Sequence, residues 1–298
     1  MKVISCIVSC LAALTVTAQP TAKQWNKDVV GWNLGNQFEC SAPGQDGESM
    51  QIGMPDNSIK AETAWGNPVV TKKTIKAVKE AGFNAVRIPI RWQCHITNAA
   101  AMSIDKAWLA RIKEVVDWCL ANDLKVIINT HHDKWLEGRP TNQYKEENNQ
   151  KLALLWLNIA SEFAQYDYRV AFAGTNEVHI KDNWGKPYKD KGEASPSDEK
   201  TMGEFFDKVV ATWGDKGLGL VMGEWGVTDR QKSGQTDIIH ENMTYYCHFL
   251  VSETKKRGIS TFIWDNNSFG SGPEHFGIFD RKAGMKVKAD WILKGIFE

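Results

Sequence analysis

The sequence is poor in several features that mark common protein classes. Its 36 Lys and Arg residues balance 36 Asp and Glu residues, so the net charge is zero. No excess of positive charge is available to bind a polyanion, and we therefore do not expect nucleic acid as a partner. Hydrophobic residues make up 42% of the chain and charged residues 24%, a composition that argues against an intrinsically disordered protein.

Cysteine is also scarce, with six residues among 298. Two of them lie in an apolar N-terminal stretch, and the other four are widely spaced. This spacing matches neither a metal-binding knuckle nor a CxxC redox motif, so we expect no metal site built on cysteine. The sequence leaves open whether any two of the four form a disulfide: Cys40, Cys94, Cys119 and Cys247.

A long apolar run occurs only at the N-terminus, over residues 3–16, where it follows the basic Lys2. Small residues come directly after the run, as at a cleavage site, and this arrangement is typical of a secretory signal peptide. We expect residues 1–18 to be that signal and residues 19–298 to form one folded domain. The run is too short to span a membrane, and no later segment is a candidate for a membrane-spanning helix.

An exported protein follows from this interpretation, either secreted or periplasmic. Residues 7–10 weakly resemble a lipoprotein box, but the apolar stretch before them is very short. We therefore expect lipid anchoring less than simple export.

The rest of the chain alternates between apolar segments of strand length and amphipathic segments of helix length. Such alternation is typical of a parallel sheet with helices outside it, and no Pro- or Gly-rich linker divides the chain. We therefore expect a single α/β domain. The predicted strands cover residues 29–34, 83–90, 124–129, 169–174, 219–222 and 259–264, and the predicted helices cover 71–82, 105–122, 145–163, 199–213, 240–256 and 286–297.

Polar residues follow the end of each predicted strand. In a barrel of parallel strands these ends meet on one face, which is where active sites lie. One polar residue at a strand end is ordinary loop composition, whereas six successive cases indicate a shared site. The residues are Asn33 and Asn36, Arg87 and Arg91, His131, His132 and Asp133, Asn176 and Glu177, Glu224 and Trp225, and Trp264, Asp265 and Asn266.

Several familiar catalytic motifs are missing from the chain, including the G-x-S-x-G elbow, the dinucleotide-binding glycine fingerprint and the zincin motif. Adjacent side chains on a regular strand point to opposite faces, so we do not expect His131 and His132 to chelate a metal together. Two carboxylates at different strand ends remain, Glu177 and Glu224. One acid of raised pKa and one ionised nucleophile form the equipment of a retaining glycosidase.

Eight short segments carry a more specific pattern. They are GWNLGN at 31–36, ETAWGNP at 62–68, GFNAVRIP at 82–89, HHD at 131–133, GTNE at 174–177, GEWG at 223–226, WDNN at 264–267 and GIFDR at 277–281. Together they resemble glycoside hydrolase family 5, in particular the endo-β-1,4-glucanases of gut and rumen Bacteroidetes. The resemblance covers about the whole chain after the N-terminal stretch.

The resemblance implies a TIM-barrel fold without cofactor or metal, a β-glucan as the partner, and a role for each strand-end residue. Glu177 would be the acid/base and Glu224 the nucleophile. The substrate-binding residues would be Asn36, Arg87, which would keep the nucleophile ionised, His131 and His132 at the −1 subsite, Asn176 on the sugar 2-hydroxyl, and Trp264 as the floor. Ideal strand alternation would send Asn176 and Glu177 to opposite faces, so we expect a twist or bulge there.

The spacing of the strand ends departs from that of the family. Successive ends lie 40 to 54 residues apart, and the interval from Glu177 to Glu224 is 47 residues, which is one βα unit. The family pattern places these two residues three units apart. About two units are therefore missing, together with the strand-6 Tyr that contacts the nucleophile in relatives. We expect a barrel of the TIM lineage reduced to about six βα units.

The expected function is retaining hydrolysis of internal β-1,4 bonds in cellulose-type glucan. A first alternative is a β-glucan-binding protein with impaired catalysis, because the missing units weaken the barrel. A second is an enzyme acting on xyloglucan, lichenan or mannan, because the subsites beyond −1 lie on loops that the motifs do not define. The sequence does not decide the oligomeric state.

Overall fold

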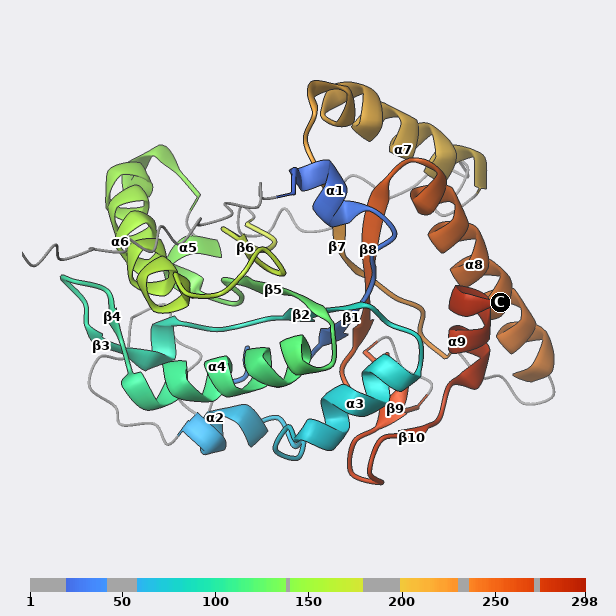
Figure 1. Cartoon of the computed structure of the whole chain (residues 1–298), viewed down its shortest axis with the longest axis horizontal. Coiled ribbons are helices and arrows are strands. Elements are labelled where there is room, and N and C mark those ends of the chain that lie inside the picture. The colour runs from blue at the N-terminus through green and yellow to red at the C-terminus, as the bar shows by residue number, and fades with distance from the viewer. Residues whose placement is uncertain (1–19, 42–57, 138–139, 179–198, 230–235, 271–273) are drawn as a thin grey trace, which may run out of the picture.

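The computed structural model describes residues 20–41, 58–137, 140–178, 199–229, 236–270 and 274–298, so the predicted signal at 1–18 lies outside it. The described residues form a curved parallel sheet with helices packed outside it (Figure 1). Its strands are β1 (Val30–Leu34), β2 (Ala85–Ile88), β5 (Lys125–Asn129), β6 (Val170–Ala173), β7 (Leu220–Trp225) and β8 (Ile259–Asp265). This confirms the predicted barrel lineage with six parallel strands.

The strand order in the sheet is β6-β5-β2-β1-β8-β7, and every pairing is parallel. The edges are therefore β6 and β7, and within the described residues no pairing joins them. A complete TIM barrel has eight strands and no edge. The opening lies between β6, which precedes Glu177, and β7, which carries Glu224. The spacing of the sequence places the missing units at this point.

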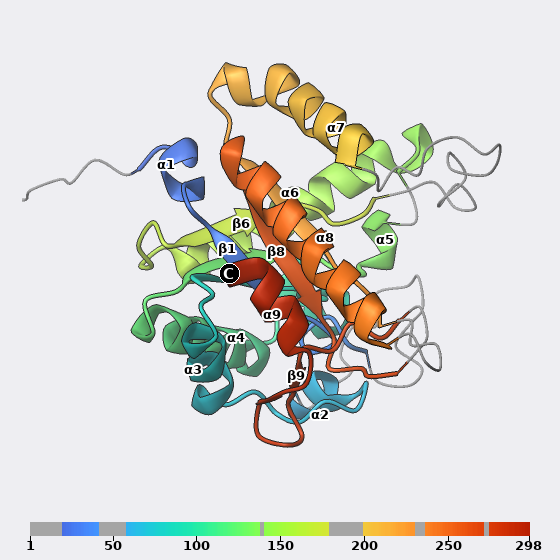
Figure 2. The same ribbon diagram turned by 90° about the vertical axis from the view of Figure 1, so that its right-hand side faces the viewer.

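Helices cover the outer face of the sheet (Figure 2). The longer ones are α3 (Lys72–Glu80), α4 (Lys106–Ala121), α6 (Lys145–Phe163), α7 (Glu199–Thr212), α8 (Thr236–Lys256) and α9 (Asp290–Phe297). Two predicted starts are wrong. Helix α8 begins at Thr236 instead of 240, and α9 begins at Asp290 instead of 286 because Lys286–Val287 forms strand β10, which pairs with β9 (Phe279–Asp280).

Shorter elements connect these units. They are α1 (Ala22–Asn26), α2 (Ser58–Thr63), α5 (Lys134–Glu137), the hairpin strands β3 (Ile96–Asn98) and β4 (Ser103–Ile104), and 3₁₀ turns at Gln93–His95, Asn142–Tyr144 and Gly214–Lys216. Within the described ranges, no helix combines the length and the apolar character that crossing a bilayer requires.

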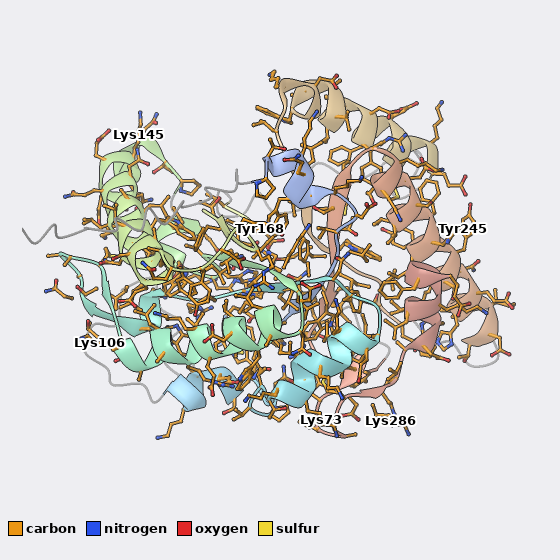
Figure 3. The ribbon with its side chains drawn as sticks, in the orientation of Figure 1. Lys73, Lys106, Lys145, Tyr168, Tyr245 and Lys286 are labelled. Carbon is orange, nitrogen blue, oxygen red and sulfur yellow. The ribbon has the colours of Figure 1, made fainter. Side chains whose placement is uncertain are left out.

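The main core lies between the sheet and the outer helices, and α4 shows how the sequence builds it. The Asp105 carboxylate accepts the backbone N–H of Trp108 at 2.8 Å and caps the start of the helix. The residues spaced along one face are buried: Trp108, Leu109, Ile112, Val115, Val116 and Cys119. Lysine side chains such as Lys106 and Lys145 extend away from the ribbon (Figure 3). All four cysteines after the N-terminal stretch are buried, and within the described residues no disulfide joins any two of them.

A smaller apolar cluster lies on the inner side of the curved sheet. It consists of Trp25, Val29, Ala85, Ile127 and Phe262. The absence of a side chain at Gly31 makes room for it, because a Cβ at that position would lie 2.1 Å from the Phe262 ring. Trp25 belongs to α1, so this helix covers the interior of the sheet at the amino ends of the strands. The polar residues lie at the opposite, carboxyl ends.

Candidate active site

A cleft of about 670 Å³ opens at the carboxyl ends of the strands. Six of the eight predicted site residues line it, and Arg87 and Asn176 lie directly behind its carboxylates. The lining residues are Asn36, Trp65, His131, His132, Glu177, Glu224, Trp225, Gly226, Trp264, Asn266, Ser268, Glu274 and Phe276. The structure therefore brings all eight predicted residues together at one end of the sheet.

Glu224 projects from the carboxyl end of β7 next to a guanidinium. Its Oε1 accepts a hydrogen bond from Arg87 Nη1 at 2.6 Å, and the Glu224 side chain is 25% exposed, which leaves it open to the cleft. The pairing of β7 with β8 shifts register between Met222 and Trp225. This irregularity changes the direction of the side chains that follow Met222 and lets Glu224 face the cleft.

Arg87 connects the two edges of the sheet through one buried guanidinium. It lies on β2 beside Asn33 of β1, and its Nη1 donates to Asn33 Oδ1 at 2.9 Å. Its Nη2 donates to Asn176 Oδ1 at 2.7 Å, after β6. Asn33 is itself fixed, because its amide donates to the carbonyl of Gly223 at 2.9 Å. The planar fork of arginine thus sets the position of the nucleophile candidate relative to Asn176.

Asn176 and Glu177 lie in the loop that follows β6, which ends at Ala173. Glu177 has a left-handed backbone with φ of 42°, so the strict alternation of a strand does not apply to this pair. Burial raises the pKa of Glu177, and the negative charge of Glu224 raises it further. A carboxyl that holds its proton to higher pH than an ordinary Glu has the property required of a general acid.

His131 and His132 follow the end of β5 and do not point to opposite faces, so that expectation is wrong. His132 has φ of 58°, and the two imidazole rings meet edge to face with centroids 4.3 Å apart. The reason is that both residues lie past the regular strand, which ends at Asn129. Within the described residues, no group of three His, Cys, Asp or Glu side chains is placed to hold a metal.

The cleft floor is aromatic. His131 stacks on Trp264 with centroids 5.9 Å apart and planes 9° from parallel. Burial lowers the pKa of His131 well below its ordinary value, and the nearby His132, Arg87 and Arg91 lower it further, so this imidazole is neutral. A neutral ring beside a flat indole suits the face of a sugar ring.

The site includes residues to which the sequence patterns gave no role. Trp65 lies in the ETAWGNP segment, is 41% exposed, and contacts the His132 ring with centroids 6.0 Å apart. That exposure was not readable from the sequence. Glu274 and Phe276 reach the cleft from the loop after β8, at positions beyond the strand-end signal at 264–266. Glu137 supports the site from behind, because its Oε1 accepts the backbone N–H of His132 at 2.7 Å.

Fold and site together define an α/β barrel of the TIM lineage with two carboxyl groups, those of Glu177 and Glu224, in one cleft at the carboxyl ends of its strands. The family model Cellulase (glycosyl hydrolase family 5) matches residues 44–194 and 185–270. Endoglucanase A of Clostridium longisporum is 32% identical over 250 residues, which cover 78% of this chain and 45% of that protein. Endoglucanase A of Ruminococcus albus is 32% identical over 215 residues, covering 71% of this chain and 53% of that protein.

This chain belongs to glycoside hydrolase family 5, and it spans about half the length of these two curated relatives. Solved structures share its fold. A GH5-4 broad specificity endoglucanase from Ruminococcus champanellensis with bound cellotriose has a TM-score of 0.76 at 22% identity, covering 95% of this chain and 100% of that one. The xyloglucan-specific β-1,4-glucanase XEG5B, from a ruminal metagenomic library, has a TM-score of 0.75 at 22% identity, covering 93% and 95%.

Proposed function

We propose that the protein is a retaining endo-β-1,4-glucanase. The observation that carries this proposal is the unequal state of two carboxyl groups lining one cleft. The pKa of Glu177 is raised by burial and by Glu224, whereas Glu224 is paired with Arg87 at 2.6 Å. One proton donor and one anion that share a cleft meet the requirements of a double displacement.

In the first step, Glu177 gives its proton to the glycosidic oxygen while a Glu224 oxygen attacks the anomeric carbon. The glycosidic bond breaks, and an ester joins the sugar to Glu224. In the second step, Glu177 takes a proton from water, the water oxygen attacks the anomeric carbon, and Glu224 leaves as a carboxylate. Both groups return to their starting state, and no cofactor is consumed.

Asn176 is suited to hold the sugar in register during both steps. Its side-chain oxygen is occupied by Arg87, while its buried amide nitrogen has no hydrogen-bond partner within the described structure. A buried donor without a partner costs free energy. The 2-hydroxyl of a bound sugar would satisfy it, and the Trp264 indole would then support the ring from below.

Cellulose-type β-glucan is the proposed substrate. The curated relatives are named endoglucanases, and a related solved structure holds cellotriose. Xyloglucan and lichenan are alternatives, because other relatives of the same fold are named for activity on them. We infer export as the localisation from the apolar residues 3–16 that follow Lys2. We also expect turnover to be slower than in full-length relatives, because the described part of the sheet has no counterpart of the strand that the family pattern places before the nucleophile strand.

Reducing-sugar release from carboxymethylcellulose tests the proposal, with Glu224→Gln as the matched control that keeps the shape of the nucleophile. We expect the wild type to release sugar and Glu224→Gln to lose about 10³-fold or more of kcat, as nucleophile removal does in other enzymes. Cellulose pull-down without any release above the Glu224→Gln level would instead identify a binding protein that has lost catalysis.

A further inference from the structure

The inside of the sheet holds a second cavity, of about 650 Å³, between the two edge strands. Arg87, Asn176, Glu177 and Glu224 line its upper end, and Trp25 lines its lower end. The remaining wall residues are mostly apolar: Pro20, Ala22, Ile127, Ala171, Phe172, Ala173 and Val221. The cavity therefore adjoins the catalytic pair from inside the sheet, on the side away from the carbohydrate cleft.

The cavity exists because the edge strands supply too little side-chain volume. The interior of an eight-stranded barrel is filled by layers of side chains from alternate strands, whereas this sheet has six strands. The inward positions of β6 are Ala171 and Ala173, which pack against the interior cluster. Val221 of β7 alternates with outward residues of the main core and is 43% exposed. Among the described residues, small side chains on both edges leave the space unfilled.

Both ends of the cavity are held by contacts within the chain. At the upper end, Arg87 bonds Asn176 after β6 at 2.7 Å and Glu224 of β7 at 2.6 Å. At the lower end, the amide of Asn26 in α1 donates to the carbonyl of Leu220. A strand of another protein, or the sheet edge of a second copy, would have to break the Arg87 contacts to enter. The geometry therefore admits a small molecule from the side and excludes another strand.

The lining also selects the chemistry of the occupant. A charged ligand would lose its hydration against walls of Ile127, Ala173 and Val221. An anion would in addition meet the carboxylate of Glu224, whose cationic partner is already engaged. The aromatic ring of Trp25 in the lining offers an edge-to-face contact to a flat ring. Apolar cavities of this kind elsewhere bind molecules such as benzene.

We propose that this cavity between β6 and β7 binds one small, uncharged aromatic molecule. Phenol is a suitable probe because it is neutral at pH 6, soluble in water and of the required shape. The cavity adjoins the carbohydrate cleft at Glu177 and Glu224, which line both, but its apolar walls lie below these two residues. Binding to those walls does not depend on the proposed enzymatic activity. Its occupant replaces the packing that the missing strands would supply, and binding should raise the melting temperature progressively as the phenol concentration increases.

Calorimetric titration of the full chain with phenol tests this, beside variants that fill the cavity from opposite walls, Ala173→Phe and Val221→Phe. The matched control is Leu157→Phe, at a position on α6 that is 66% exposed and lies outside the lining. We expect each filling variant to weaken phenol binding at least tenfold, and the control to bind as the wild type does. Cellotriose should not displace the phenol.

Absence of saturable binding to the wild type would overturn the proposal, and so would undiminished binding to both filling variants. Displacement by cellotriose would also overturn it, because phenol would then sit in the carbohydrate cleft. If a filling variant fails to fold, the variant on the opposite wall gives the same comparison. A wild-type crystal soaked in phenol gives an independent answer, since density between β6 and β7 supports the site and its absence there refutes it.

Discussion

Replacement of Arg87 by alanine should nearly eliminate turnover, and the structure gives the size of the effect. The guanidinium donates to Glu224 at 2.6 Å, to Asn176 at 2.7 Å and to Asn33 at 2.9 Å. Breaking a buried ion pair costs about 3–5 kcal/mol, and the partial exposure of Glu224 places this one at the lower end. If Glu224 loses about 3 kcal/mol of support in the transition state, kcat/KM falls about 100-fold.

The assay is kcat/KM on cello-oligosaccharide, measured with the melting temperature of each variant. Arg87→Lys keeps the positive charge but loses the planar guanidinium that donates to several partners at once. The activity of this variant should therefore be higher than that of Arg87→Ala and lower than that of the wild type. Arg257→Ala is the control, because it removes only surface ion pairs, those with Asp207 and Glu253, and lies outside the cleft. A folded Arg87→Ala variant within threefold of the wild type would refute the assignment.

Three further predictions concern single side chains. Glu177→Ala should slow cello-oligosaccharide hydrolysis far more than that of activated aryl glycosides, which need little protonation; steady-state kinetics with equal losses on both would contradict the acid role. Trp264→Ala should raise KM about tenfold or more without lowering the melting temperature, whereas unchanged kinetics would make Trp264 structural. Burial raises the pKa of Asp133 to about 7 from 3.8, so the free energy of unfolding should fall by about 3 kcal/mol between pH 4 and pH 7; in urea titrations, Asp133→Asn should remove this contribution to the slope.

The sheet was largely predictable because its signals are local and repeated. Apolar runs of strand length mark the six strands, and the length of a βα unit limits how many fit between two strand ends. The 47-residue interval from Glu177 to Glu224 admits one such unit, and β6 and β7 accordingly remain the edges of the sheet. The family match was equally accessible, since the motifs at the strand ends are short and specific.

The conformation at the strand ends was not predictable from those signals. His132 and Glu177 both adopt positive φ, which ordinary residues rarely do, and no local pattern marks either position. Alternation rules therefore gave the wrong directions for the two histidines. The long-range contacts of Trp65 and Glu274 were also missed, because a loop residue reaches the cleft through the fold and not through its own sequence.

The position of Arg87 explains how a sheet of six strands keeps the proposed catalytic residues together. Arg87 belongs to β2, which lies in the middle of the sheet. The Arg87 side chain crosses the interior and contacts residues at both edges. The missing units would complete the wall opposite β2, so their loss removes neither β2 nor the residues that Arg87 contacts. What is lost is the packing between β6 and β7, where the cavity lies. Reduced activity in this protein should therefore come from a loosely supported Glu224, and filling that cavity should restore part of it.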